Sequence, residues 1–135
     1  RSTLATSSAA QMCIRDSLGV ISQSLDEALD PETGDLRKWY MHNTSHWIGL
    51  DVHDAGVYKP GGTPRVLEPG MCLTIEPGLY FGAWRPDVDC PERYANIGIR
   101  IEDDVLITTD GPVVLTADCP KSIDDIENIV GQDLA

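Results

Sequence analysis

Short runs in which apolar and polar residues alternate dominate the chain from residue 47 onward, and glycine and proline separate them. A period of two is typical of half-buried β-strands, whereas an amphipathic helix needs a period near 3.6. The sequence therefore predicts strands in three runs, "WIGLDVH" (47–53), "MCLTIEPGLYF" (71–81) and "IGIRIEDDVLITTDGPVVLT" (97–116). In the third run we expect a bend near Asp103–Asp104, and a Thr-Asp-Gly-Pro turn before a short last strand.

Helical patterns lie at the two ends of this strand region. Residues 18–29 place leucine and isoleucine at helical spacing, and a turn signal, "DPETGD", follows them. Near the C-terminus, Ser122 is a plausible N-cap and Asp125 supplies the acid of a capping box before an apolar face. The 135 residues fit one domain. The expected fold class is α+β, a curved and mostly antiparallel sheet with flanking helices.

The charge of the chain excludes some partners. Acidic residues outnumber basic ones by 22 to 10, and the net charge is −12. We therefore expect no nucleic-acid partner and no anionic membrane surface. No apolar run approaches the roughly 20 residues that span a bilayer. The four cysteines form no Cys-x-x-Cys pair, which favours reduced thiols and a cytoplasmic location (Cys13, Cys72, Cys90 and Cys119).

All three histidines fall within residues 42–53. His46 and His53 are seven residues apart, so they would lie on opposite sides of an ideal strand. Both can face one site only if the chain bends between them, and Gly49 offers a place for such a bend.

Two glutamates are the natural partners of these histidines. Glu76 and Glu102 each lie in a predicted strand, where a buried carboxylate must be paired or coordinated. Imidazole together with carboxylates suits Mn²⁺, Co²⁺ or Zn²⁺. The residues alone leave two interpretations open, a metal site or a set of hydrogen-bonded and surface groups.

Three motifs in this order carry a family resemblance: "HNTSHWIGLDVHD", "LEPGMCLTIEPGLYF" and "IGIRIEDDVLIT". They resemble the C-terminal part of the catalytic domain of aminopeptidase P (Xaa-Pro aminopeptidase), and prolidase is a close relative. Both are pita-bread-fold metallopeptidases. The resemblance implies that residues 18–135 form the C-terminal part of such a domain. Residues 1–17 are interpreted as an unmatched tail, with a sequence-assembly artefact as one explanation.

The resemblance also implies a dinuclear metal centre that activates a hydroxide. Mn²⁺ is the first expectation for the two divalent ions, with Co²⁺ and Zn²⁺ as alternatives. His46 and Glu76 match ligands of one metal, and Glu102 matches the glutamate that bridges both.

The same resemblance assigns further roles around the substrate. Glu76 would also pass a proton to the leaving nitrogen. His53 would contact the substrate and stabilise the reacting carbonyl, and His42 would lie at the substrate pocket. Arg100 would line the site and could orient Glu102, with which it shares a strand face.

The implied partner is a peptide with proline at the second position, and the implied parent enzyme can be homo-oligomeric. The chain departs from the family in one respect: two further metal-binding aspartates have no sound match before His42. We therefore expect this chain alone to lack peptidase activity. Prolidase activity on Xaa-Pro dipeptides and a metal-free, non-peptidase pita-bread protein are the alternatives.

Overall fold

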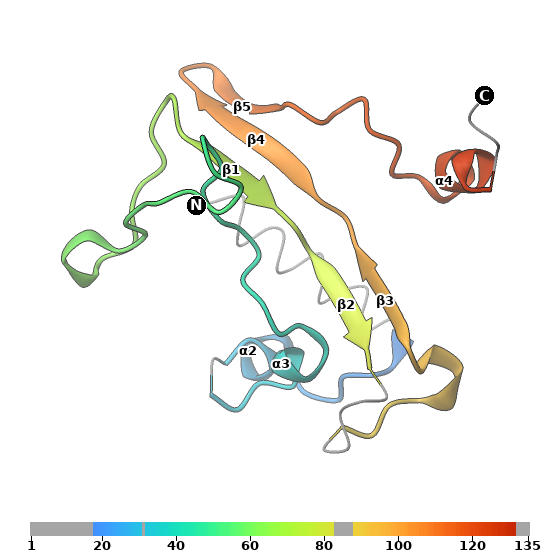
Figure 1. Cartoon of the computed structure of the whole chain (residues 1–135). Coiled ribbons are helices and arrows are strands. Elements are labelled where there is room, and N and C mark those ends of the chain that lie inside the picture. The colour runs from blue at the N-terminus through green and yellow to red at the C-terminus, as the bar shows by residue number, and fades with distance from the viewer. Residues whose placement is uncertain (1–17, 31, 83–87, 132–135) are drawn as a thin grey trace.

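A computed structural model describes residues 18–30, 32–82 and 88–131 of the chain. Three short α-helices, two 3₁₀ helices and five strands make up this part, and the strands pair only in antiparallel fashion (Figure 1). The elements are α2 (Leu25–Ala28), α3 (Leu36–Trp39), η1 (Pro60–Gly62), β1 (Cys72–Ile75), β2 (Gly78–Phe81), η2 (Glu92–Tyr94), β3 (Ile97–Arg100), β4 (Asp103–Thr108), β5 (Gly111–Val114) and α4 (Ile123–Ile129). The predicted antiparallel α+β character is confirmed.

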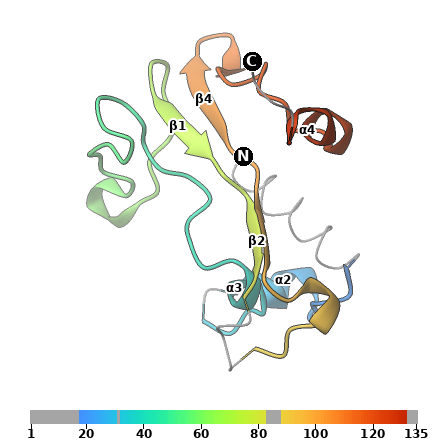
Figure 2. The same cartoon turned by 45° about the vertical axis from the view of Figure 1, so that its right-hand side comes forward.

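The central element of the fold is a long ribbon made of two antiparallel stretches of chain. Strand β1 pairs with β4, and β2 continues β1 and pairs with β3. Figures 1 and 2 show the ribbon running from β1 and β4 at one end to β2 and β3 at the other. The pairing is interrupted at Glu76–Pro77 on one side and Ile101–Glu102 on the other, although the Ile101 N–H still donates to the Pro77 carbonyl at 3.0 Å. Proline has no N–H to donate, so it suits such a break.

The register explains where the two carboxylates meet. Gly78 is opposite Arg100 on one side of the interruption, and Ile75 is opposite Asp103 on the other. The register is therefore the same on both sides, and it places Glu76 directly opposite Glu102. Residues directly opposite each other in an antiparallel pair share one face of the sheet.

The third run folds nearly as predicted. Its bend falls at Ile101–Glu102, two residues before the expected position, because the break follows Pro77 on the partner strand. The Thr-Asp-Gly-Pro turn is confirmed: it joins β4 to β5, and Gly111 takes a positive φ of 122°. The second run, expected as one strand, is divided into β1 and β2 by the same break.

The predicted strand over residues 47–53 is wrong. Only Trp47 makes a bridge, to Leu73, and the residues after Ile48 form bends. The chain turns back on itself because the Asp54 N–H donates to the Trp47 carbonyl at 3.0 Å. Leu50 is fully exposed as a result, so the apolar alternation of this run does not mark a buried face.

The predicted helix over residues 18–29 is mostly wrong, because only α2 within it is a separate helix. Gly19 takes a positive φ of 69°, which an α-helix does not accommodate. Helix α2 begins after Ser24, whose N–H and hydroxyl both donate to the Glu27 carboxylate. This contact also lowers the pKa of Glu27, chiefly through the hydroxyl.

The main apolar cluster lies where the N-terminal helices meet β2. It consists of Ile21, Ala28, Trp39 and Phe81, all buried, with the rings of Trp39 and Phe81 5.1 Å apart. Leu73 of β1 and Val105 of β4 are also buried and lie opposite each other. The first cluster lies at the β2 end of the ribbon and this pair lies at the β1 end, so the interruption falls between two buried groups.

The C-terminal helix α4 forms at the predicted cap. Ser122 accepts a hydrogen bond from the Asp125 N–H at 3.1 Å, as expected for an N-cap. Its apolar residues stay exposed (Ile123, Ile126, Ile129 and Val130). Across residues 18–30, 32–82 and 88–131, none of the helices has the length and apolar character needed to cross a membrane. The unmatched tail expected at residues 1–17 lies outside the described residues.

Candidate metal centre

The segment from Thr44 to Ile48 runs antiparallel to β1 and carries His46 to the ribbon. The Glu76 N–H donates to the Thr44 carbonyl at 2.8 Å, and the Thr74 N–H donates to the His46 carbonyl at 2.9 Å. The Ile48 N–H donates to the Cys72 carbonyl at 3.3 Å. Three main-chain bonds thus fix the position of His46 beside the interruption of the ribbon.

His46, Glu76 and Glu102 converge there. One ligand atom from each lies within 4.8 Å of the others, and this is the one such group of three in the part of the chain that the structure describes. Glu76 is 6% exposed, whereas Glu102 is exposed. Two carboxylates directly opposite each other across a strand pair repel unless a cation lies near them. The structure therefore brings together the three predicted ligands.

The orientation of the His46 ring fits a metal ligand. Its Nδ1 lies 2.9 Å from the Trp47 carbonyl, which can only accept, so a proton on Nδ1 would leave the lone pair of Nε2 for an ion. Nε2 lies 3.2 Å from Oε1 of Glu76. Two ligand atoms bound to one ion at about 2.0–2.2 Å lie about 3 Å apart when cis. The donor set and its spacing therefore fit a divalent ion.

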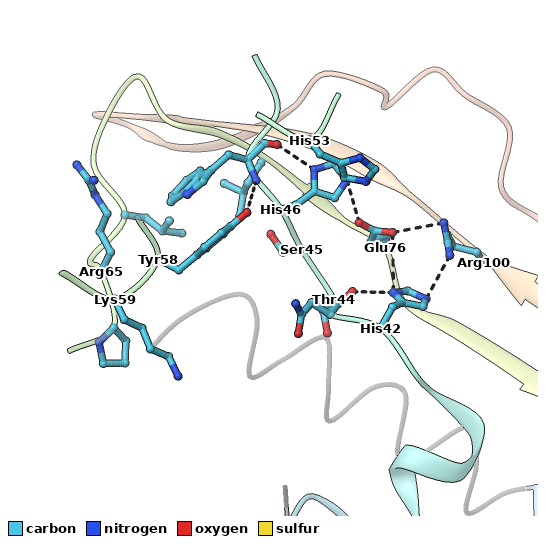
Figure 3. Close-up of a pocket in the computed structure, with 15 residues that line it drawn as sticks. His42, Thr44, Ser45, His46, His53, Tyr58, Lys59, Arg65, Glu76 and Arg100 are labelled. Atoms are coloured by element: carbon cyan, nitrogen blue, oxygen red, sulfur yellow. Dashed lines mark hydrogen bonds and ion pairs between the residues drawn. The ribbon is translucent and has the colours of Figure 1, made fainter. Parts of the chain in front are cut away.

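A second group of polar side chains holds the other oxygen of Glu76. Oε2 lies 3.5 Å from Nη1 of Arg100 and 4.0 Å from Nδ1 of His42. The Arg100 Nε donates to the Tyr80 hydroxyl at 2.7 Å, and that hydroxyl lies 2.7 Å from Nε2 of His42. Figure 3 shows Glu76 with its two ion-pair partners on this side, Arg100 and His42. Glu76 thus joins the candidate metal ligands on one side to a hydrogen-bonded group on the other.

Arg100 forms its ion pair with Glu76, whereas the sequence suggested that it could orient Glu102. The ion pair found within the described residues joins it to Glu76, and no such pair with Glu102 occurs there. The hydrogen bond to Tyr80 raises the pKa of the Arg100 guanidinium, and the charges of Glu76 and Glu102 act in the same direction. Arg100 stays charged, so it compensates the negative charge of Glu76.

His53 reaches His46 through the bend at Gly49. The two imidazole rings have centroids 4.4 Å apart, although His53 is exposed. A side chain at Gly49 would overlap the carboxylate of Asp54, so a larger residue here would require that carboxylate to move. The predicted bend is confirmed, and it brings both histidines to one place.

Gly49→Ala should therefore displace the Asp54 carboxylate and move His53 away from His46, at a cost of about 0.5 kcal/mol in unfolding free energy. Urea unfolding and the NMR signals of the imidazole rings measure the two effects. The control is the double variant with Asp54→Ala, which removes the overlapping carboxylate and should restore most of the stability. A Gly49→Ala chain with unchanged histidine signals would contradict this role of the turn.

A cavity of about 720 Å³ lies in front of these side chains. Five of the six predicted site residues line it: His42, His46, His53, Glu76 and Arg100. Its other wall comes from the loop after His53, with Tyr58, Lys59 and Arg65 (Figure 3). The ring of Tyr58 stacks on that of Trp47 at a centroid distance of 5.5 Å. The cavity gives a ligand access to the candidate metal centre.

Two residues of this site were not predicted from the sequence. Tyr80 accepts a hydrogen bond from Arg100 and shares another with His42. Thr74 lies between Glu76 and the main chain of His46. The alternation of the second run places Thr74 on the same strand face as Glu76, which is the signal that could have identified it.

Comparison with known proteins gives one consistent result. The sequence profile of Metallopeptidase family M24 matches residues 4–109. Xaa-Pro aminopeptidase of Escherichia coli is 48% identical over 113 residues, which cover 84% of this chain and 24% of the relative. Xaa-Pro aminopeptidase of Haemophilus influenzae is 45% identical over 113 residues, covering 84% of this chain and 25% of the relative.

Solved structures agree with the sequence matches. Aminopeptidase PepP of Pseudomonas aeruginosa superposes with a TM-score of 0.78 at 40% identity, over 92% of this chain and 27% of that one. Escherichia coli aminopeptidase P in complex with substrate gives 0.74 at 43% identity, over 91% and 27%. The chain has the corresponding part of the pita-bread fold and spans about a quarter of the length of these relatives. With the profile match over most of its length, the chain belongs to Metallopeptidase family M24.

Proposed function

We propose that this chain forms part of a metalloaminopeptidase that releases the N-terminal residue from Xaa-Pro peptides. The observation that carries the proposal is the convergence of His46, Glu76 and Glu102, from three separate segments, on one point beside a cavity. The relatives compared above are named Xaa-Pro aminopeptidase or aminopeptidase P, which supports this specificity over others in the family.

In the intact enzyme the three residues would hold a dinuclear centre, with His46 and Glu76 on one ion and Glu102 between the two. Mn²⁺ is the ion we propose first, and a zinc-substituted form of Escherichia coli aminopeptidase P makes Zn²⁺ a second choice; Co²⁺ is the third. When bound, such ions supply an activated hydroxide and polarise the scissile carbonyl.

The side chains of this chain would then perform the remaining steps. Glu76 accepts a proton from the attacking water and delivers it to the leaving nitrogen. His53 donates a hydrogen bond to the oxyanion as it develops. His42 and Arg100 line the substrate side of Glu76, and Arg100 keeps that carboxylate in place through its ion pair.

Substrate selection must come from shape, because the bond before proline has no N–H to recognise. The rings that line the cavity would contact the proline ring, while a free N-terminus would lie near the carboxylates. Prolidase activity on dipeptides is the nearest alternative. A metal-free homologue is the second alternative, and the retention of all three ligands in one cluster disfavours it.

The chain by itself should lack this activity. Within the described residues it offers one group of three ligands, and no aspartate pair joins it. Three ligands make an incomplete dinuclear site, so we expect weak metal binding without hydrolysis. A cytoplasmic location and a homo-oligomeric parent stay predictions.

A chimera tests the proposal directly. The 113 matched residues of Escherichia coli Xaa-Pro aminopeptidase are replaced by those of this chain. The chimera should release the first residue of an Xaa-Pro-Xaa tripeptide in a Mn²⁺-dependent manner, and it should leave the Xaa-Ala-Xaa tripeptide nearly untouched.

Three controls separate the alternatives. An Xaa-Pro dipeptide tests for prolidase activity, the chain alone tests for an autonomous enzyme, and bound metal is measured in each sample. A folded chimera that binds two Mn²⁺ ions but cleaves neither tripeptide would contradict the proposal. Mn²⁺-dependent cleavage by the chain alone would contradict its expected inactivity.

A further inference from the structure

Thr74 connects the two ligands that lie closest together. Its side chain is 1% exposed, the lowest value of any polar residue described. Its Oγ1 lies 3.0 Å from Oε1 of Glu76 and 3.1 Å from the main-chain nitrogen of His46. One hydroxyl group thus contacts both His46 and Glu76.

The direction of these two hydrogen bonds is fixed by chemistry. The His46 N–H can only donate, so Oγ1 of Thr74 accepts from it. A carboxylate can only accept, so the single hydroxyl proton of Thr74 goes to Oε1 of Glu76. No other assignment satisfies all three groups.

This arrangement limits where Glu76 can point. Oε1 accepts from Thr74 on one side and faces Nε2 of His46 at 3.2 Å on the other. Because the Thr74 N–H also donates to the His46 carbonyl at 2.9 Å, the strand and the histidine segment are joined at this residue twice. A change in the hydroxyl would affect both ligands together.

We propose that Thr74 is a positioning residue, whose hydroxyl holds the Glu76 carboxylate and the His46 main chain so that Oε1 and Nε2 face one point. The proposal rests on the proposed function, in that this point is where a divalent ion would bind. Partners that orient metal ligands usually contribute about 10–100-fold to metal affinity. Thr74 is expected to act at that scale without contacting the ion.

The test compares Thr74→Val, which keeps the shape and removes the hydroxyl, with Thr74→Ser, which keeps the hydroxyl. Mn²⁺ affinity of the full chain is measured by electron paramagnetic resonance of the free ion. Thr74→Val should bind about 10–100-fold more weakly, and Thr74→Ser should stay near wild type. Thr108→Val is the matched control, because it removes a threonine hydroxyl bond in the β4–β5 turn instead.

A metal-free arm keeps the two proposals apart. In EDTA, Thr74→Val should lower the urea midpoint strongly in the wild-type chain and by less than half as much in a Glu76→Ala background. The positioning role would be overturned if Thr74→Val lowered the urea midpoint equally in the wild-type chain and in the Glu76→Ala variant. It would also be overturned if Thr74→Val bound Mn²⁺ as tightly as the wild-type chain. A wild-type chain that binds no Mn²⁺ would count against the proposed metal site, and the metal-free arm would then decide the role of Thr74 alone.

Discussion

Replacing Phe81 by alanine is expected to lower the free energy of unfolding by about 3–5 kcal/mol, the usual cost of removing a large buried aromatic side chain. Phe81 is 4% exposed and lies between the rings of Trp39 and Tyr94, at centroid distances of 5.1 Å and 5.2 Å. It ends β2 and joins the ribbon to the N-terminal helices. Because small domains are stable by about 5–15 kcal/mol, the loss should be a large fraction of the total.

Urea unfolding followed by circular dichroism measures this effect, and Ile99→Ala is the matched control. Ile99 lies in β3, pairs with Leu79 beside Phe81, and is 61% exposed. Its removal should change the unfolding free energy by about 0.5 kcal/mol or less. Similar losses for the two variants would mean that the cluster around Phe81 does not support the fold.

The strands could be predicted from the apolar–polar alternation of the sequence where the apolar positions are also the buried ones. The alternation in the second and third runs marks strands that pair through most of their length, and the turn before β5 follows from its residues. The break at Pro77 shows the limit of local pattern. It displaces the bend on the partner strand, and a partner strand is not visible in a local sequence window.

Two segments show how local pattern misleads. Residues 47–53 alternate as a strand would, yet a turn closed by the Asp54 N–H prevents pairing beyond Trp47. Residues 18–29 have helical spacing, yet Gly19 adopts a positive φ and Ser24 caps a later, shorter helix. In both segments a single residue, through hydrogen bonding or backbone conformation, overrides the apolar period.

The candidate site was partly visible in the sequence. Residue types and the family resemblance identified the predicted ligands, but only the register shows that Glu76 lies directly opposite Glu102. Register is set by long-range pairing, so sequence spacing cannot supply it. The contact of Tyr80 with Arg100 depends on the β2–β3 pairing, and the contact of Thr74 with His46 depends on the pairing of residues 44–48 with β1, which is why neither was assigned a role.

Replacing His46 by alanine is expected to weaken Mn²⁺ binding by the full chain by about 100-fold or more, since even loss of an outer partner costs about 10–100-fold. In the chimera the same change should abolish metal-dependent peptidase activity. The reason is geometric: Nε2 of His46 is the one nitrogen in the group of three, 3.2 Å from Oε1 of Glu76. Titration with Mn²⁺ and tripeptide hydrolysis measure the two losses.

His42→Ala is the matched control, because it makes the same chemical change four residues away. His42 also lines the cavity, but its Nε2 contacts Tyr80 at 2.7 Å and its Nδ1 lies 4.0 Å from Oε2 of Glu76, on the substrate side. Because 4.0 Å is beyond hydrogen-bond distance from Glu76, we expect Mn²⁺ affinity within about threefold of wild type, together with a raised KM in the chimera. Equal losses of Mn²⁺ affinity in both variants would show that the two histidines share one role. That result would contradict the proposal that His46 lies on the metal side of Glu76 and His42 on its substrate side.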